Sequence, residues 1–144
     1  MPRPDGAGVP LGVVVAQTAK VLDRAFEQAL AKAGGNRPTW LVLLAVTSGA
    51  GTLQTVLADR VGISGPTLTH HLDRLEAGGL VRRTRDSQNR RAQSVELTEA
   101  GEAMFFRLRD AAVAFDALLR SGLDDAAVAS VTEILQRLAS NVGD

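Results

Sequence analysis

The sequence predicts a mainly α-helical protein that carries one small β-hairpin. Hydrophobic residues make up 45% of the 144 residues and aromatic residues only 3%, so the core must be built from Leu, Val, Ile and Ala, which suits helices packed on helices. Apolar residues recur every three or four positions through most of the chain, as in amphipathic helices. The period changes only between residues 80 and 97, where two extended segments flank a run of turn-forming residues.

The first part of the chain predicts an arm and two helices. Residues 1–10 contain three prolines and two glycines and are expected to form a flexible arm. Residues 11–33 have helical apolar spacing, and Gly34-Gly35 is expected to end this helix, because glycine accepts the left-handed conformation of a helix C-terminus. A second helix is expected to begin near Pro38 and to bury the apolar run that follows.

Two short helices separated by a tight turn are predicted next. Thr52 is expected to cap the first of them, whose core positions are Leu53, Val56, Leu57 and Val61. Gly62-Ile63 predicts the turn, and Ser64 is a natural N-cap for the second helix. The inward-facing side chains of this second helix are Leu68, Leu72 and Leu75.

The remainder predicts a hairpin and two further helices. Residues 80–85 and 91–97 are the candidate strands, and residues 86–89 form the turn between them. Thr98-Glu99 opens a helix that Gly122 ends, and Asp124 caps the last helix. The apolar stripes of these two helices are too extensive for so small a protein to cover alone, so pairing with a second copy is expected.

The charge of the chain is unevenly distributed. The net charge is zero, yet residues 60–94 contain seven arginines against three acidic residues, a net charge of +4. Such a segment indicates either a patch that binds a polyanion or a solvated basic face. Charge alone does not separate these two interpretations.

The order of the predicted elements favours the patch that binds a polyanion. Two short helices joined by a tight turn, followed directly by an Arg-rich hairpin, predict a winged helix-turn-helix, in which the second helix enters the major groove of DNA and the wing reaches the minor groove. The helical wheel turns small or polar side chains outward on the second helix, and Thr can bond base edges or phosphates. The free N–H groups near Ser64 and Gly65 suit a phosphate oxygen.

Several segments in this order and spacing resemble the MarR family of bacterial transcription regulators. They are residues 57–64 (LADRVGIS), 68–76 (LTHHLDRLE), 79–83 (GLVRR) and 97–101 (LTEAG). The resemblance implies a homodimer, with residues 11–35 and 98–144 as the helical dimerisation region and 36–97 as the DNA-binding lobe. It also implies a repressor that binds a palindromic operator and is released by a small aromatic or phenolic ligand.

The candidate site residues follow from the motif and the resemblance together. The expected DNA contacts are Ser64, Gly65, Pro66, Thr67, Thr69, His70, Arg74, Arg83, Arg85, Asn89, Arg90 and Arg91. The expected dimer interface contains Leu11, Val15, Leu22, Phe115, Leu118, Val131, Leu135 and Leu138. The tip of the wing departs from the family's usual Asp-x-Arg, because Asn89 stands where the Asp is expected and can bond the guanidinium of Arg91 only without charge assistance.

The resemblance also implies a ligand cleft between the lobe and the dimerisation helices. Its expected walls are Phe26, Trp40 and His71, with Arg83 as the partner of a ligand carboxylate. The simpler interpretation of Trp40 is a core residue. His70 and His71 are not expected to hold a metal, since adjacent helical side chains point about 100° apart.

The sequence disfavours several other classes of protein. No Cys is present, which excludes disulfides and thiolate metal sites, and no Ser/His/Asp set or glycine-rich phosphate loop indicates an enzyme or a cofactor. No apolar run approaches the ~20 residues of a membrane span, and residues 1–5 do not resemble a signal peptide, so a cytoplasmic protein is expected. The alternative is a winged-helix module that binds protein rather than DNA.

Overall fold

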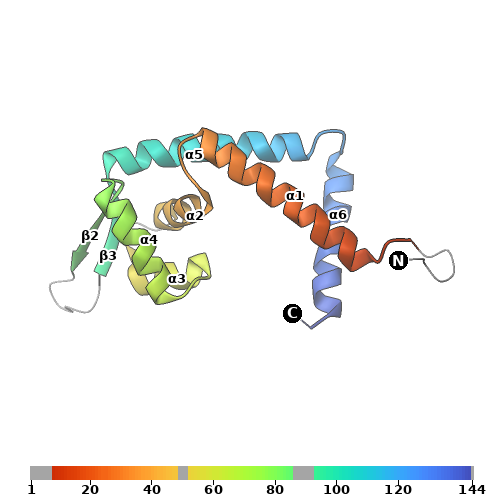
Figure 1. The fold of residues 1–144 in the computed structure, drawn as a ribbon, viewed down its shortest axis with the longest axis horizontal. Helices are drawn as coiled ribbons and strands as arrows, with labels where there is room; N and C mark the ends of the chain where they lie inside the picture. Colours follow the sequence, from red (N-terminus) through yellow and green to blue (C-terminus); the bar gives the residue numbers. More distant parts are fainter. Residues whose placement is uncertain (1–7, 49–51, 86–92, 144) are drawn as a thin grey trace. The chain divides into compact units, whose positions relative to one another are not determined.

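The computed structural model describes residues 8–48, 52–85 and 93–143 (Figure 1). The chain divides into two compact units, one up to Ala112 and one from Val113, and the division falls within a helix. The elements are α1 (Leu11–Lys32), α2 (Arg37–Thr47), β1 (Thr52–Leu53), α3 (Gln54–Val61), α4 (Gly65–Ala77), β2 (Val81–Arg85), β3 (Gln93–Leu97), α5 (Glu99–Leu119) and α6 (Asp125–Asn141). The predicted fold class, mainly helical with a β-hairpin, is confirmed.

The helix ends follow the local chemistry of the sequence. The side chains of Ser64 and Asp124 accept hydrogen bonds from the backbone N–H groups of Thr67 (3.3 Å) and Ala127 (2.8 Å), so both predicted caps are confirmed. Asn36 caps α2 in the same way. Gly62 ends α3 in the left-handed conformation, with φ at +76°, and allows the sharp turn into α4.

The sheet has three antiparallel strands in the order β1-β3-β2. The hairpin pairs Val81 with Leu97 and Arg85 with Gln93, which agrees with the predicted strands to within two residues at each end. The turn predicted at residues 86–89 lies outside the described residues.

The prediction for the start of α3 was wrong. Thr52 does not cap this helix but belongs to β1, where it pairs with Val95 of β3. Leu53 takes the N-cap position without a side-chain hydrogen bond. Leu53 and Val56 are 39% and 40% exposed rather than buried, because the short helix presents only Leu57 fully to the core. A strand of two residues is too short to show alternation of apolar and polar residues in the sequence. β1 is recognised only by its pairing with β3.

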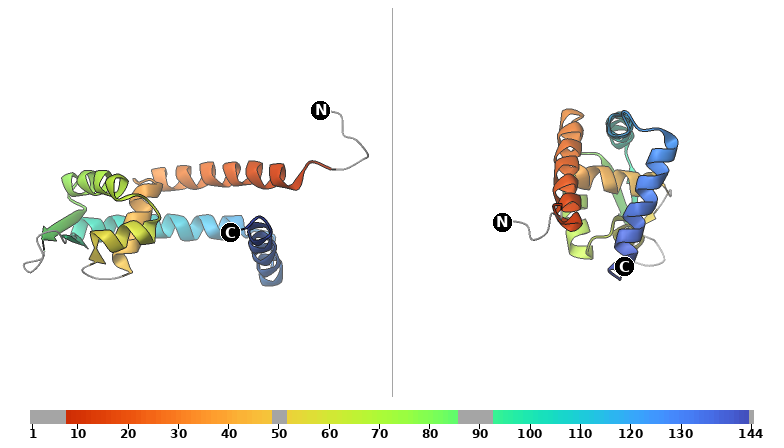
Figure 2. Two further views of the ribbon diagram at one scale, coloured as in Figure 1. Left: turned by 90° about the horizontal axis from the view of Figure 1, so that it is seen from below. Right: turned by 90° about the vertical axis from the view of Figure 1, so that its right-hand side faces the viewer.

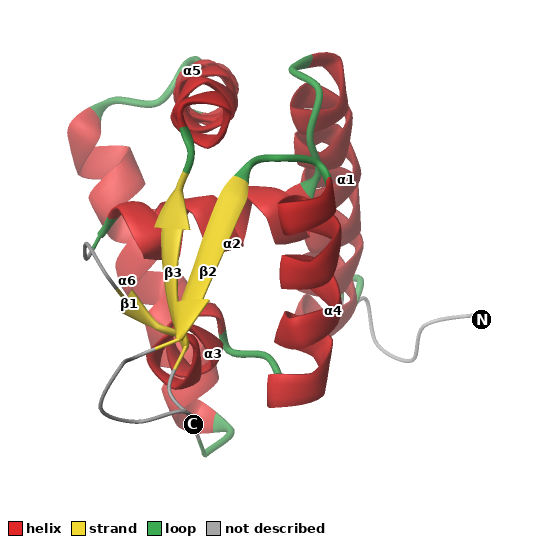
Figure 3. Ribbon diagram, turned by 90° about the vertical axis from the view of Figure 1, so that its left-hand side faces the viewer, coloured by secondary structure: helices red, strands yellow, loops and turns green. Residues whose placement is uncertain are grey.

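One hydrophobic core holds the first unit together. Figure 3 shows β2 and β3 in front of α2, with α4 beside β2. The fully buried side chains come from α1 to α5 and from β3, and they include Leu43, Leu57, Leu68, Leu72, Val95 and Leu108. This packing fixes α3, α4 and the hairpin relative to one another.

α1 and α6 bury little in a single chain. Leu30, near the C-terminus of α1, is its buried residue, Phe26 is partly buried against the core, and the N-terminal part of the helix extends past the core (Figure 2). α6, which belongs to the second unit, has no buried residue. No helix in the described part of the chain is both long enough and apolar enough to span a membrane.

Candidate nucleic-acid interface

The face of α4 opposite the core is polar and exposed. Leu68, Leu72 and Leu75 are 0%, 0% and 7% exposed and anchor the helix. The predicted outward residues Ser64, Gly65, Pro66, Thr67, His70 and Arg74 are all exposed. The structure therefore brings them together on one surface of a rigidly packed helix.

The N-terminus of α4 combines hydroxyl groups with an open backbone. The Ser64 hydroxyl lies 2.8 Å from that of Thr67. A Cβ placed on Gly65 would find no atom within 4 Å, so this first turn is unobstructed. Such a helix N-terminus can accept an anionic group from the solvent side.

Thr69 differs from its neighbours because it is only partly exposed. Its hydroxyl oxygen accepts a hydrogen bond of 2.8 Å from the Nε2 atom of Gln54, at the start of α3. Sequence reasoning missed Gln54, which is 15 positions away and carries no motif. The expected role of Thr69 in DNA contact stays a prediction.

Arg83 links the wing to α4. Its Nη2 atom lies 2.6 Å from a carboxylate oxygen of Asp73 and 3.0 Å from one of Glu76, and its backbone N–H donates to Glu76 at 3.0 Å. The side chain is only 16% exposed. The hydrogen bond from Arg83 lowers the pKa of Glu76, and the same contact raises the pKa of Arg83. Arg83 therefore already has two carboxylate partners within the chain, which sequence reasoning missed.

The remaining wing residues are placed only in part. Arg85 is exposed at the end of β2, and the hydroxyls of Thr84 and Ser94 lie 2.9 Å apart across the hairpin. Asn89, Arg90 and Arg91 lie outside the described residues. Their predicted contacts with DNA stay predictions.

The four residues expected to line a ligand cleft occupy different surroundings. Trp40 stacks on Phe105 with ring centroids 5.7 Å apart and packs against the core, in line with the simpler interpretation. Phe26 also packs against the core, and Arg37 lies over its ring at 5.7 Å. His71 lines a pocket of about 240 Å³ in which the other three take no part. The structure does not gather these residues into one cleft.

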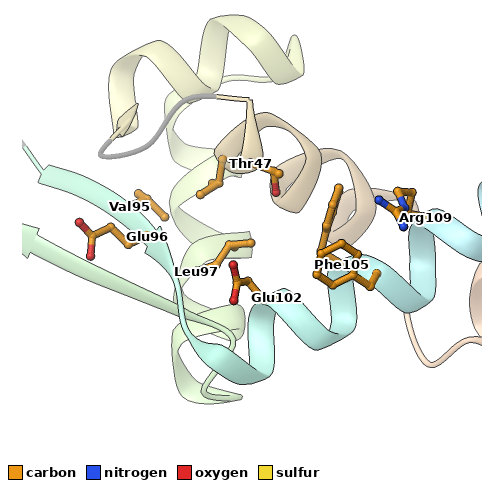
Figure 4. A pocket seen from close by; sticks show the side chains of 9 residues that line it. Thr47, Val95, Glu96, Leu97, Glu102, Phe105 and Arg109 are labelled. Atoms are coloured by element: carbon orange, nitrogen blue, oxygen red, sulfur yellow. The ribbon is translucent and has the colours of Figure 1, made fainter.

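A larger pocket of about 490 Å³ lies between α2, β3 and α5 (Figure 4). Thr47, Val95, Leu97 and Phe105 contribute to its walls. The charged residues Glu96, Glu102 and Arg109 also line it. No sequence signal indicated this pocket, because its walls come from segments about 50 residues apart.

Metal-ligating side chains do not cluster in the part of the chain that the structure describes. The imidazole centroids of His70 and His71 lie 5.8 Å apart with tilted rings, and His70 is the more exposed of the two.

A helix-turn-helix whose second helix is tied by an arginine to a β-hairpin defines a winged helix-turn-helix protein. Residues 34–92 match the model of the MarR family. The HTH-type transcriptional regulator TtmR of Methylorubrum extorquens (strain PA1) is 34% identical over 101 residues, which cover 70% of this chain and 52% of TtmR. The chain thus spans about half the length of this curated relative.

Solved structures show the same architecture over nearly the whole chain. The transcriptional regulator PA3341 is 31% identical with a TM-score of 0.72, covering 91% of this chain and 96% of that one. The transcriptional repressor CouR, bound to a 23-mer DNA duplex, is 27% identical with a TM-score of 0.79, covering 90% and 92%. The chain belongs to the MarR family of transcription regulators, which are not enzymes.

Proposed function

We propose that this protein is a sequence-specific DNA-binding transcription regulator. The observation that carries the proposal is the exposed polar face of α4, with Thr67, His70 and Arg74 presented by a helix whose other face is locked into the core. A helix held in this way can enter the major groove without losing its own packing. The excess of arginine in residues 60–94 supplies the attraction to phosphates.

The wing extends the same surface. Arg83 holds β2 against α4, so the hairpin and the recognition helix approach DNA as one body. Support also comes from CouR, whose structure contains bound DNA. We assign the predicted contacts Ser64, Gly65, Pro66, Thr67, His70, Arg74 and Arg85 to DNA on this basis, together with Asn89, Arg90 and Arg91 in the wing.

A winged-helix module that binds only protein is the alternative. Such a module needs an apolar or acidic docking face on α4. The exposed face of α4 is instead polar and carries Arg74, and its carboxylates Asp73 and Glu76 are both bonded to Arg83 of the wing, which favours DNA.

Salt dependence tests the proposal. Arg74→Gln is expected to weaken binding about equally for all DNA sequences and to reduce the slope of log K against log salt by about 0.9, because one phosphate contact is lost. The measurement is fluorescence anisotropy of a labelled duplex between about 50 and 200 mM salt. Arg109→Gln, which removes the same charge from α5, is the matched control and is expected to leave the slope unchanged. A wild-type affinity for DNA that does not fall with salt would contradict DNA binding.

We propose further that the protein acts as a homodimer through α1, α5 and α6. Of the predicted interface residues, Leu11, Leu118, Val131 and Leu135 are 59%, 72%, 47% and 48% exposed, and Val15, Leu22, Phe115 and Leu138 are partly buried. Ile134 is a further exposed apolar residue of α6, at 57%. Exposed apolar stripes of this extent mark an interface, and a second copy covers them most simply.

The dimer is expected to have about twice the 15.1 kDa mass of one chain in light scattering at micromolar concentration. Leu135→Asp is expected to shift the mass toward the monomer, because dimerisation would bury an unpaired carboxylate at a cost of several kcal/mol. Gln136→Asp places the same charge on a neighbouring, exposed position of α6 away from the stripe and is expected to remain dimeric. A wild-type mass of one chain would refute the dimer.

A dimer presents two copies of α4, and we propose that these contact a palindromic operator in the cytoplasm of a bacterium and that the protein acts there as a repressor. Release by a small aromatic ligand rests on the family resemblance. Within one chain the structure does not support this ligand response, because the four residues expected to line the ligand cleft lie in separate surroundings. They are Phe26, Trp40, His71 and Arg83.

A further inference from the structure

The hydrogen bond between Gln54 and Thr69 has a direction that matters for recognition. A hydroxyl group has one proton and two lone pairs. The Nε2 atom of Gln54 donates to Thr69 Oγ1 at 2.8 Å and thereby occupies a lone pair. Among the described residues no acceptor takes the Thr69 proton, so the hydroxyl keeps this proton, directed away from Gln54, together with its second lone pair.

The orientation of the Gln54 amide supports this assignment. The Oε1 atom of Gln54 is buried and has no hydrogen-bond partner among the described residues. Reversing the amide would bring Oε1 to Thr69 and leave both N–H groups of Nε2 in that buried position without an acceptor. Buried N–H groups without partners are rarer in proteins than buried carbonyl oxygens without partners. The amide is therefore held with its donor toward Thr69.

An open pocket of about 440 Å³ lies beside Thr69, between α3 and the start of α4. Gly65, which presents no side chain, and Asp59 both line it, as does Gln93 of β3. The carboxylate of Asp59 opposes the approach of a phosphate into this pocket. A neutral base edge with an acceptor atom fits the pocket better.

We infer that Gln54 is a positioning residue that fixes Thr69 as a hydrogen-bond donor to a base acceptor in the operator, such as guanine O6 or N7. This inference rests on the proposed DNA-binding function. Gln54 itself does not contact DNA. It determines base preference through the direction of one hydrogen bond.

The test compares base preferences at every position of the site, obtained by selecting bound duplexes from a randomised library at pH 8. Thr69→Val is expected to reduce the preference at one base pair by about tenfold, because the donor is lost at nearly constant shape. Gln54→Glu is expected to change the preference at that same base pair, because a carboxylate can only accept and forces Thr69 to donate inward. Gln54→Met, which is uncharged, is expected to reduce the preference there as well.

Gln93→Glu is the matched control, since it places the same charge in the same pocket without a contact to Thr69. It is expected to weaken binding to all sequences evenly. The inference is overturned if Gln54→Glu and Gln93→Glu give the same preferences, or if Thr69→Val leaves every position unchanged. Wild-type protein that selects no sequence at all would refute the proposed function as well. Thermal unfolding of each variant verifies that it is folded.

Discussion

Replacing Gly101 with Ala is expected to lower the free energy of unfolding by about 3 kcal/mol, at the upper end of the usual cost of overpacking. Gly101 is buried at the start of α5, and a Cβ there would overlap the carbonyl oxygen of Leu80. Hydrogen bonds hold both Leu80 and Gly101 in place, so the two residues cannot easily move apart to make room for the Cβ. The Leu80 oxygen accepts from Thr98 N–H at 3.1 Å, and Gly101 N–H donates to the Thr98 hydroxyl at 3.0 Å.

The measurement is chemical denaturation of wild type and variant under the same conditions. Gly12→Ala, in the first turn of α1, is the control, because a Cβ at that position meets no atom within 4 Å beyond its own helix and its chain neighbours. Its unfolding free energy is expected to stay within about 0.5 kcal/mol of wild type or to rise slightly, since Ala favours a helix over Gly. Equal denaturation midpoints for Gly101→Ala and wild type would show that the close approach of α5 to Leu80 is absent.

Arg83→Met is expected to weaken DNA binding by about tenfold, the effect of misplacing one good contact worth 1–3 kcal/mol, because the wing loses its fixed position against α4. The cost in stability is expected to be small, since Asp73 and Glu76 are exposed and solvent screens their attraction to Arg83. Arg82→Met removes the same charge from the opposite, exposed face of β2 and serves as control. If both variants lost affinity by the same factor, Arg83 would act through its charge alone.

The pH dependence of stability gives a second measurement on Arg83. Arg83 lowers the pKa of Glu76 from its ordinary value of 4.5. A carboxyl whose pKa is lower in the folded state stabilises that state above its unfolded pKa, and this contribution is lost as the pH falls through the folded pKa. The stability difference between wild type and Arg83→Met is therefore expected to be full at neutral pH and to shrink below pH 4.5. A difference that stays constant down to pH 3 would contradict the carboxylate contact.

The helices and the recognition face could be predicted because their signals are local. Ser64 and Asp124 cap helices through atoms three residues away, and the spacing of Leu68, Leu72 and Leu75 alone determines which side of α4 is buried. The hairpin was predicted for the same reason, from alternation within each strand and a turn between them.

Roles that depend on a partner distant in the sequence could not be predicted in this way. Arg83 was predicted to contact DNA because it is one of the arginines of the wing. The packing of β2 against α4 instead turns its guanidinium toward Asp73 and Glu76. Thr69 has the spacing of an outward residue, yet α3 brings Gln54 to its hydroxyl. Thr52 resembles a helix cap, yet β3 pairs with it.

The sequence by itself therefore determined the fold class, the order of the helices and the hairpin, and the face of α4 that is exposed, because hydrophobic period and capping act within a few residues. Only the tertiary structure decided which polar side chains on that face and on the wing are available to a ligand. A side chain of Arg or Thr bonds whichever group the folded chain brings within about 3 Å. That distance is set by how α3, α4 and β2 pack on their shared core.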